Sequence, residues 1–556
     1  MAAPSPSSAA GTTTIFRARR ILTMNPSRPE ATHVAVRDGR ILGVGPLDEL
    51  TGWGAHVLDD RFADKVLLPG FVEGHSHASE GTFWRWPYVG RFDRLDPDGK
   101  VWPGAASIEA VVERLIAEER RLGSPEEGMA AWGLDPIYYG ERRVGRQDLD
   151  RVSTARPVGV MHASGHIFNV NTRVLELAGL LRPGVNHPGI PLGADGLPTG
   201  ELKGPDAMTL AGRHFGFDRE ALANDEPGLR RFARLCVRQG VTTATDLANL
   251  LPDSAVAMMR RVTGEPGFPV RIVSFRRFQA LTAAQVVEHA KALRGQSTDR
   301  LRLGAVKLFV DGSIQGFSAR LRWPGYYNGA PNGLWYTPPE TIREVYGLAL
   351  QEGVLVHSHT NGDQATEMAL DCLEAALQGQ PARDHRFTLQ HCQLADAAQF
   401  RRMRALGMCA NLFPNHHFYW GDQHYETTVG PERATRMNAC ATALAAGVPL
   451  AIHSDAPVTP LSPLFTAWAA VNRLTASGRV LGTEERIGVA DALRTITLGA
   501  AYTLRLDGEV GSIECGKRAD FAVLEEDPTA VPPERLKDVA IWGTVQDGRP
   551  FAAAQA

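Results

Sequence analysis

The sequence predicts an α/β fold: a TIM (β/α)8 barrel with a large insertion after its first strand, next to a small β-sandwich domain built from both chain ends. Short apolar runs alternate with helical stretches through the middle of the chain, which is typical of repeated βα units around a parallel sheet. Both ends contain short segments of alternating polarity separated by turn residues, which is typical of β-hairpins. A length of 556 residues accommodates a large barrel with an appended module.

The middle of the chain contains eight apolar runs, the number of strands that a TIM barrel requires. They lie at residues 67–77, 240–247, 269–275, 304–312, 353–363, 385–393, 407–415 and 447–455. The first two runs are widely separated. We therefore expect residues 78–239 to contain an inserted subdomain with strand-like pieces of its own, such as GMAAWGLD and RPVGVMHASGH.

The remaining segments complete the predicted domain organisation. The first residues are small and polar, and we expect a disordered leader over residues 1–12. Residues 13–68 and 506–556 are expected to form the composite β-sandwich domain, and residues 69–505 the barrel with its insertion.

Composition and charge narrow the classes of function. A hydrophobic content of 44% and a charged content of 22% are ordinary for a soluble globular enzyme. The net charge of -3 offers no basic excess to neutralise phosphates, so we expect no nucleic-acid partner. The six cysteines contain no C-x-x-C pair, which suits a reducing compartment. Because neither a signal peptide nor a membrane-spanning apolar segment is recognisable, we expect a cytoplasmic protein without membrane contact.

Polar side chains stand at the ends of five of the eight runs. In a βα barrel these ends line the open mouth, where catalytic groups collect. Side chains alternate along a strand, so the two histidines of the H-S-H sequence point the same way. Imidazoles with a carboxylate suit Zn²⁺ or a similar divalent ion. The residues collected at this mouth are His75, His77, Lys307, His359, His391 and Asp455.

Each of these residues also has an ordinary structural interpretation. A histidine near a strand end is more often a hydrogen-bonded core residue than a ligand. Asp455, shortly before Pro457, could serve as a helix N-cap or a turn residue. In the fifth run His357 and His359 share a face, so the pattern leaves either as the ligand.

Lys307 stands among apolar residues, where an unpaired ammonium group would be costly to bury and would lose its proton or find a partner. A neutral lysine amine can react with carbon dioxide to form a carbamate, an anionic oxygen ligand able to bridge two metal ions. The alternative is an ordinary ion pair with Asp311, on the same strand face.

Five stretches together resemble a known family. They are LLPGFVEGHSH, VKLFVDGSIQGFSARL at 306–321, HTNGDQA at 359–365, LQHCQL around the sixth run, and HSDAPVTPLSPL after the eighth. They resemble the amidohydrolase superfamily, specifically its YtcJ-like, N-substituted formamide deformylase-like branch, also called amidohydrolase family 3. The resemblance spans most of the chain, and the two end segments resemble the β-sandwich beside the barrel of these enzymes.

The resemblance implies a ligand set. His75, His77 and Asp455 would hold the more buried ion, His359 and His391 the second, and carbamylated Lys307 would bridge the two, with Zn²⁺ as the expected metal. The family pattern chooses the histidine that opens H-x-x-G-D, so His357 becomes a supporting or pocket residue and His453 a structural one.

The resemblance also implies the reaction. A metal-activated water would hydrolyse a C–N bond of a small molecule: an amide, an N-substituted formamide or a carbamate. Asp455 would accept the proton of the water and pass it to the departing nitrogen, with Lys307 as the second catalytic residue. The candidates for contact with substrate are His166, Gln315, Tyr419 and Trp420, although aromatic residues in a large protein usually pack in the core.

Alternative functions stay open at this point. A deaminase of an amino-heterocycle would use the same barrel with one metal ion, but Lys307 would then have no explanation. A metal-dependent binding protein without catalysis is a second alternative, against which the complete ligand set argues. The sequence names neither the two halves of the substrate nor the oligomeric state, for which a homodimer stays open.

Overall fold

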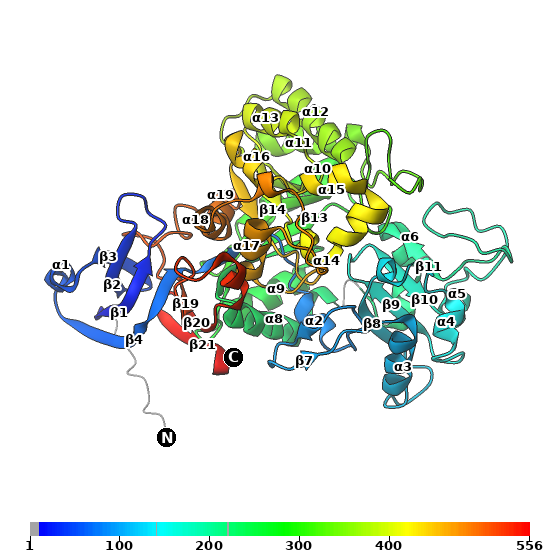
Figure 1. Ribbon diagram of the computed structural model, residues 1–556, viewed down its shortest axis with the longest axis horizontal. Coiled ribbons are helices and arrows are strands. Elements are labelled where there is room, and N and C mark those ends of the chain that lie inside the picture. The colour runs from blue at the N-terminus through cyan, green and yellow to red at the C-terminus, as the bar shows by residue number, and fades with distance from the viewer. Residues whose placement is uncertain (1–10, 141, 219–221, 556) are drawn as a thin grey trace.

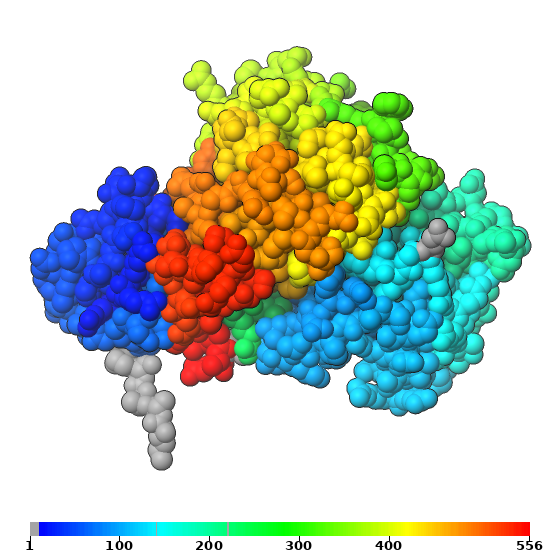
Figure 2. All heavy atoms as spheres, viewed as in Figure 1, coloured from blue at the N-terminus to red at the C-terminus, as the bar shows by residue number. Residues whose placement is uncertain are grey.

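The computed structural model describes residues 11–140, 142–218 and 222–555. Figure 1 shows a central body of strands and helices, with a β-rich lobe at one end and the residues of the predicted insertion forming a second lobe at the other. The space-filling view in Figure 2 shows the same three parts in contact. The leader predicted over residues 1–12 lies mostly outside the described residues, and the first strand begins at Thr13.

The central body is built on one eight-stranded parallel sheet of the TIM type, as predicted, and each of the eight apolar runs contributes one strand. The strands are β5 (Phe71–Glu73), β12 (Val241–Asn249), β13 (Arg271–Arg277), β14 (Leu301–Phe309), β15 (Leu355–Thr360), β16 (Thr388–His391), β17 (Cys409–Leu412) and β18 (Leu450–Ile452).

The first and last strands of this sheet meet just beyond their C-terminal ends. Ser76 and Ala456 form a parallel bridge. The Asp455 N–H donates to the His75 carbonyl at 3.0 Å, and the His77 N–H donates to the Ala456 carbonyl at 2.8 Å. These backbone bonds place Asp455 beside the two histidines of the H-S-H sequence.

Helices cover the outer face of the parallel sheet, because their apolar stripes match its buried strands. In α8, for example, Leu229, Phe232 and Cys236 are buried at helical spacing, whereas the arginines between them are not. From the end of the insertion onward, the helices are α8 (Glu226–Arg238), α9 (Asp253–Thr263), α10 (Ala283–Arg294), α11 (Pro339–Glu352), α12 (Asp363–Gly379), α13 (Ala397–Leu406), α14 (Asn415–Gln423), α15 (Gly430–Arg436), α16 (Cys440–Ala445), α17 (Pro463–Asn472), α18 (Val489–Arg494) and α19 (Ala500–Thr503).

The insertion contains its own four-stranded sheet in the order β11-β10-β9-β8. Side chains alternate along β8, so that Trp132 faces one apolar core with α5 and α6, and Ala131 faces another with α3. Both sheet faces are therefore covered. The elements are α2 (Glu80–Phe83), β6 (Arg94–Leu95), β7 (Val101–Trp102), α3 (Ile108–Glu119), β8 (Met129–Leu134), α4 (Arg146–Asp150), β9 (Val158–His162), β10 (Ile167–Val170), α5 (Thr172–Leu177), β11 (Glu201–Lys203) and α6 (Gly204–Ala211).

Both chain ends join in one seven-stranded sheet, in the order β21-β20-β19-β4-β1-β2-β3, where a two-sheet sandwich was expected. The long strand β4 pairs with β1 along one edge and with β19 along the other, which merges the two ends into a single sheet. The elements are β1 (Thr13–Leu22), β2 (Glu30–Arg37), β3 (Arg40–Gly45), α1 (Leu47–Leu50), β4 (His56–Pro69), β19 (Phe521–Leu524), β20 (Ile541–Gln546) and β21 (Arg549–Ala552).

Two further sequence observations can be compared with the structure. All six cysteines are free; five are buried and Cys515 is exposed. Among the helices of the described ranges, none combines the length and the apolar character required to cross a bilayer.

A buried ion pair connects the terminal sheet to the parallel sheet. Arg271, at the start of β13, donates from Nη1 to Asp520 Oδ2 at 2.6 Å, and the two side chains are 1% and 2% exposed. Asp520 directly precedes β19, and its carbonyl accepts from Gly70 N at 2.8 Å just before β5. The ion pair and this backbone hydrogen bond therefore hold the starts of β13 and β5 against the terminal sheet.

Replacing Asp520 by alanine is expected to lower the free energy of unfolding by about 3–5 kcal/mol, because it removes the nearest counter-charge of the buried Arg271 guanidinium and leaves it with the Asp547 carboxylate at 3.7 Å. Urea denaturation followed by circular dichroism would measure this. Asp60→Ala is the control, because its contact with Arg17 spans 3.6 Å between half-exposed side chains. Equal unfolding midpoints for the two variants would contradict the anchoring role.

Candidate metal centre and adjoining cavity

The six residues predicted from the strand ends lie in one region at the C-terminal edge of the parallel sheet. His75 and His77 follow β5, Lys307 lies in β14, and Asp455 follows β18. His359 lies in β15 and His391 ends β16. The strands β14, β15 and β16 are neighbours in the sheet, and their register sets these side chains at successive heights: Lys307 is level with His357, His359 with Gln390, and His391 with Thr360.

Asp455 is the centre of this cluster. Its Oδ1 lies 3.3 Å from His75 Nε2 and 3.3 Å from His77 Nε2, and its Oδ2 lies 3.7 Å from His391 Nδ1. Burial raises the pKa of this carboxyl, and the nearby His77 opposes that rise. The Asp455 backbone has a φ of 52°, a left-handed conformation that costs energy for a non-glycine residue and recurs at functional sites.

A chain of hydrogen bonds fixes which nitrogen of His75 carries the proton. His357 Nε2 lies 3.0 Å from the Thr503 carbonyl and must donate to it, so its Nδ1 accepts from Gln390 Nε2 at 2.8 Å. The other end of that amide, Gln390 Oε1, then accepts from His75 Nδ1 at 2.7 Å. The Nε2 of a neutral His75 therefore presents a lone pair to Asp455. Both nitrogens of His357 are engaged by these bonds, whereas Nδ1 of His359 faces another imidazole nitrogen, His391 Nε2, at 3.0 Å.

His77 is oriented in the same way. Its Nδ1 is hydrogen-bonded to the Leu247 carbonyl, which can only accept, so its Nε2 also presents a lone pair when the ring is neutral. Two imidazole lone pairs and a carboxylate oxygen thus face one another, and Asp455 Oδ1 has no hydrogen-bond partner among the described residues. This donor set fits a divalent cation such as Zn²⁺.

His359 and His391 form the second part of the cluster. His391 Nε2 lies 3.0 Å from His359 Nδ1, and His359 Nε2 lies 3.3 Å from the Gly312 carbonyl and 3.1 Å from Asn361 Nδ2. Burial lowers the pKa of both rings well below the usual range, so they are neutral. Two neutral imidazole nitrogens that face each other fit a second cation between them, provided that His359 keeps its proton on Nε2 toward Gly312.

Lys307 forms no salt bridge with any residue of the described ranges. Its Nζ is buried and makes no hydrogen bond within the described residues, and it lies 5.3 Å from the centre of the Phe309 ring. Burial lowers the pKa of this amine to about 7, against the opposing charge of Asp455. The alternative ion pair with Asp311 is wrong, because the Asp311 carboxylate accepts instead from the backbone N–H groups of Asn361, Gly362 and Arg320, each at 2.9 Å.

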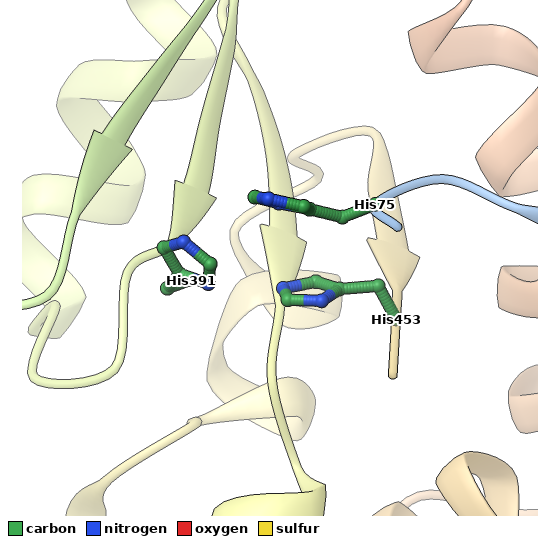
Figure 3. Close-up of side chains that lie close together, drawn as sticks. All are labelled: His75, His391 and His453. Atoms are coloured by element: carbon green, nitrogen blue, oxygen red, sulfur yellow. The ribbon is translucent and has the colours of Figure 1, made fainter. Parts of the chain in front are cut away.

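His453 belongs to the cluster although the sequence interpretation made it structural. Figure 3 shows its ring beside those of His75 and His391, and the ligand atoms of the three lie within 4.8 Å of one another. The His75 and His453 rings stack at 4.7 Å. Neither nitrogen of His453 makes a hydrogen bond of standard geometry to a described residue. The sequence feature that could have identified His453 is its position two residues before Asp455. The same alternation of side chains identified the H-S-H pair.

Glu73 is a second residue that the sequence interpretation missed. Its Oε1 accepts from Ser454 N at 3.1 Å and its Oε2 from Ser454 Oγ at 2.9 Å. Burial raises the pKa of Glu73 to about 8. The carboxyl group thus links β5 to the segment that carries Asp455. The sequence feature that could have identified Glu73 is its position at the end of β5, two residues before His75.

A cavity of about 180 Å³ adjoins the cluster and lies between the ends of the parallel strands and the insertion. His77, Arg277 and Phe309 line it on the side of the parallel sheet. Its apolar walls come mainly from the insertion and from the helices that follow it: Phe83, Met161, Met208, Phe217, Leu222, Leu229, Leu250, Met258 and Met259.

The four residues predicted to contact substrate lie in different places in the structure. His166 lines this cavity, and its ring lies 5.2 Å from that of His359. Gln315 is buried outside the cavity lining. Tyr419 and Trp420 line a smaller neighbouring cavity instead, and Trp420 Nε1 donates to Asp135 Oδ2 at 3.0 Å. Of the four, only His166 is positioned to face the main cavity.

Comparison with known proteins identifies the family. A model of the amidohydrolase family matches residues 63–552. The chain is 26% identical over 547 residues to the putative amidohydrolase YtcJ of Bacillus subtilis, covering 95% of this chain and 97% of that protein. It is 26% identical over 553 residues to N-substituted formamide deformylase of Arthrobacter pascens, covering 95% and 96%.

A solved structure has the same fold. The structure of an uncharacterized metal-dependent hydrolase from Pyrococcus horikoshii superposes with a TM-score of 0.69 at 22% identity, over 94% of this chain and 99% of that one. The region matched by the family model contains all eight strands of the parallel sheet and the whole histidine and aspartate cluster. The resemblance predicted from the five sequence stretches is confirmed, and the chain belongs to the amidohydrolase family.

Proposed function

We propose that this protein is a metal-dependent hydrolase that cleaves a C–N bond of a small molecule, in an amide, an N-substituted formamide or a carbamate. The observation that carries the proposal is Asp455 Oδ1, which faces two imidazole lone pairs with no hydrogen-bond donor between them. The name of the Arthrobacter relative, N-substituted formamide deformylase, supports the choice of bond.

The described side chains fit two divalent ions, for which Zn²⁺ is our proposal. His75, His77 and Asp455 would hold the first, and His359 and His391 the second. When bound, such ions would supply Lewis acidity, which lowers the pKa of a coordinated water and polarises the scissile carbonyl.

Lys307 is proposed to be the carbamylated ligand shared by both ions. With a pKa of about 7, its buried amine is substantially neutral near neutral pH. The amine nitrogen adds to the carbon of carbon dioxide, one N–C bond forms and one proton leaves. The product is an anion, which removes a buried positive charge and supplies oxygen ligands beside the neutral imidazoles.

Asp455 is proposed to accept the proton of the attacking water and then to donate it to the departing nitrogen. Its raised pKa moves it toward the range in which a carboxyl group can exchange protons near neutrality. We propose that His166, on the cavity wall beside His359, contacts the substrate.

The function is tested by an activity screen. Formamides, N-acyl amines, carbamates and lactams are expected to release amine or acid, and Asp455→Asn is expected to lower the rate 10²- to 10⁴-fold because it removes the proton acceptor. Asp60→Asn, on an exposed side chain, is the control. Release of ammonia from amino-heterocycles with no turnover of any amide would favour the deaminase, and an unaltered function of Asp455→Asn would favour a binding protein.

Lys307→Ala is expected to reduce the metal content from two ions to one per chain, measured by elemental analysis of the purified protein. Lys291→Ala, on an exposed lysine paired with Glu352, is the control. In wild-type protein stripped of metal, the rate of reactivation by Zn²⁺ and bicarbonate should rise with pH through about 7. Below that pH the Lys307 amine is protonated and cannot add to carbon dioxide. One ion per chain in both wild type and Lys307→Ala would contradict the two-metal scheme.

A further inference from the structure

We propose that the substrate carries a neutral hydrocarbon group, alkyl or aromatic, that is bound in the cavity beside His77. This inference depends on the proposed function in one respect: it takes the cleaved bond of the substrate to lie at the metal centre. The walls contain methionines from β9, α6 and α9 and phenylalanines from α2 and from the end of β14. Such walls stabilise apolar groups through burial, and flexible methionines adapt to differently shaped ligands.

The cavity is continuous with the metal centre. His77, whose Nε2 faces Asp455, lies on its wall, and so does Leu247, whose carbonyl orients that ring. Phe309 lines the cavity and lies 5.3 Å from the Lys307 amine. A hydrocarbon group bound in the cavity could therefore belong to a substrate whose C–N bond lies at the metal centre.

Two of the three charged residues of the walls, Asp246 and Arg277, have partners, whereas the third, Asp225, has one carboxylate oxygen, Oδ2, without a hydrogen-bond partner among the described residues. Asp246 accepts from Ala78 N at 3.0 Å, Asn249 Nδ2 at 2.7 Å and Ser274 Oγ at 3.2 Å. The Arg277 guanidinium packs over the Phe309 ring at 4.7 Å. A charged substituent would lose its hydration among the apolar side chains that make up most of the wall, so the walls favour a neutral group.

Two series of amides with linear chains of one to eight carbons, one lengthened on the nitrogen and one on the acyl side, test this inference. In one series kcat/KM is expected to rise about fourfold per methylene until the cavity is filled. Met258→Glu should flatten the rise, because Met258 is a half-buried wall residue. Met368→Glu, also half-buried on a helix but outside the cavity lining, should preserve it.

Binding is measured separately from catalysis, so that failure of the proposed function can be distinguished from failure of the hydrocarbon-binding site. Calorimetric titration of N-hexylacetamide and N-methylacetamide into metal-stripped protein should show tighter binding of the hexyl compound. That result with no hydrolysis of any amide would overturn the proposed function alone. Equal affinities, or kcat/KM independent of chain length in both series, would overturn the hydrocarbon-binding site.

A second inference concerns Arg94 in the insertion, which we infer to be a positioning residue for Asp455. Arg94 donates from Nη1 to the Pro457 carbonyl at 2.7 Å and from Nη2 to the Thr459 carbonyl at 3.2 Å. It also donates from Nη2 to Glu80 Oε1 at 2.6 Å, and both side chains are no more than 3% exposed.

These contacts hold the two sides of the metal centre together. Glu80 opens α2, three residues after His77, whereas Pro457 and Thr459 follow Asp455. The Asp455 backbone is in the left-handed region and needs support from its surroundings. The Arg94 guanidinium also lies over the Trp132 ring of β8 at 4.8 Å, which connects this support to the sheet of the insertion.

Arg94→Lys tests this inference, because lysine keeps the charge but cannot bond two carbonyls and a carboxylate in one plane. We expect kcat to fall about 10²-fold with KM little changed, because a small displacement of the proton-transferring group is costly. Arg114→Lys is the matched control, since Arg114 also lies in the insertion and donates to a backbone carbonyl, that of Tyr88.

Amide hydrogen exchange supplies a readout that does not depend on activity. Exchange at residues 454–460 should accelerate in Arg94→Lys and in Glu80→Gln, and should not change in Arg114→Lys. A lower unfolding midpoint with unchanged exchange and unchanged kcat would mean that Arg94 only stabilises the fold, and would overturn the inference. Accelerated exchange in a protein that hydrolyses no amide would leave the positioning contact intact and contradict only the proposed function.

Discussion

The arrangement of the metal centre depends on one hydrogen bond, from His75 Nδ1 to Gln390 Oε1. A neutral imidazole has one donor and one acceptor, so this bond decides that the His75 lone pair faces Asp455. The amide of Gln390 is oriented in turn by His357 and the Thr503 carbonyl, and Asn411 Nδ2 donates to the same Oε1 at 2.9 Å. A backbone carbonyl far from the centre thus determines which atom of His75 can bind a cation.

The sequence predicted the parallel sheet and the convergence of the proposed ligands at its C-terminal edge, because both follow from local rules. Apolar runs form buried strands, parallel strands end on the same edge, and alternate residues share a face. The same rules placed Glu73 and His453 on that face, but polarity alone did not distinguish a ligand from a supporting residue. Tyr419 and Trp420 fill a neighbouring space because their ring contacts depend on the insertion, whose packing no local pattern describes.

The insertion is more than a cover over the open end of the sheet. It supplies the apolar walls of the cavity, and through Arg94 it reaches the segment after Asp455. One lobe therefore contacts both the space available to a substrate and the backbone segment that follows the proposed proton acceptor. Sequence change in this lobe can alter the choice of substrate while the ligands, which come from the parallel strands, stay in place.

The position of β4 in the terminal sheet has a consequence for biosynthesis. β4 lies between β1, which precedes it in the chain, and β19, which follows all eight strands of the parallel sheet. At about 5–20 residues per second, a ribosome would complete β19 roughly 20–90 s after β4. During that time one edge of β4 has no partner and is open to pairing with other chains. A chaperone or the charged side chains of β4 must therefore protect that edge during synthesis. The folded protein gives no sign of this need, because β19 then covers the edge.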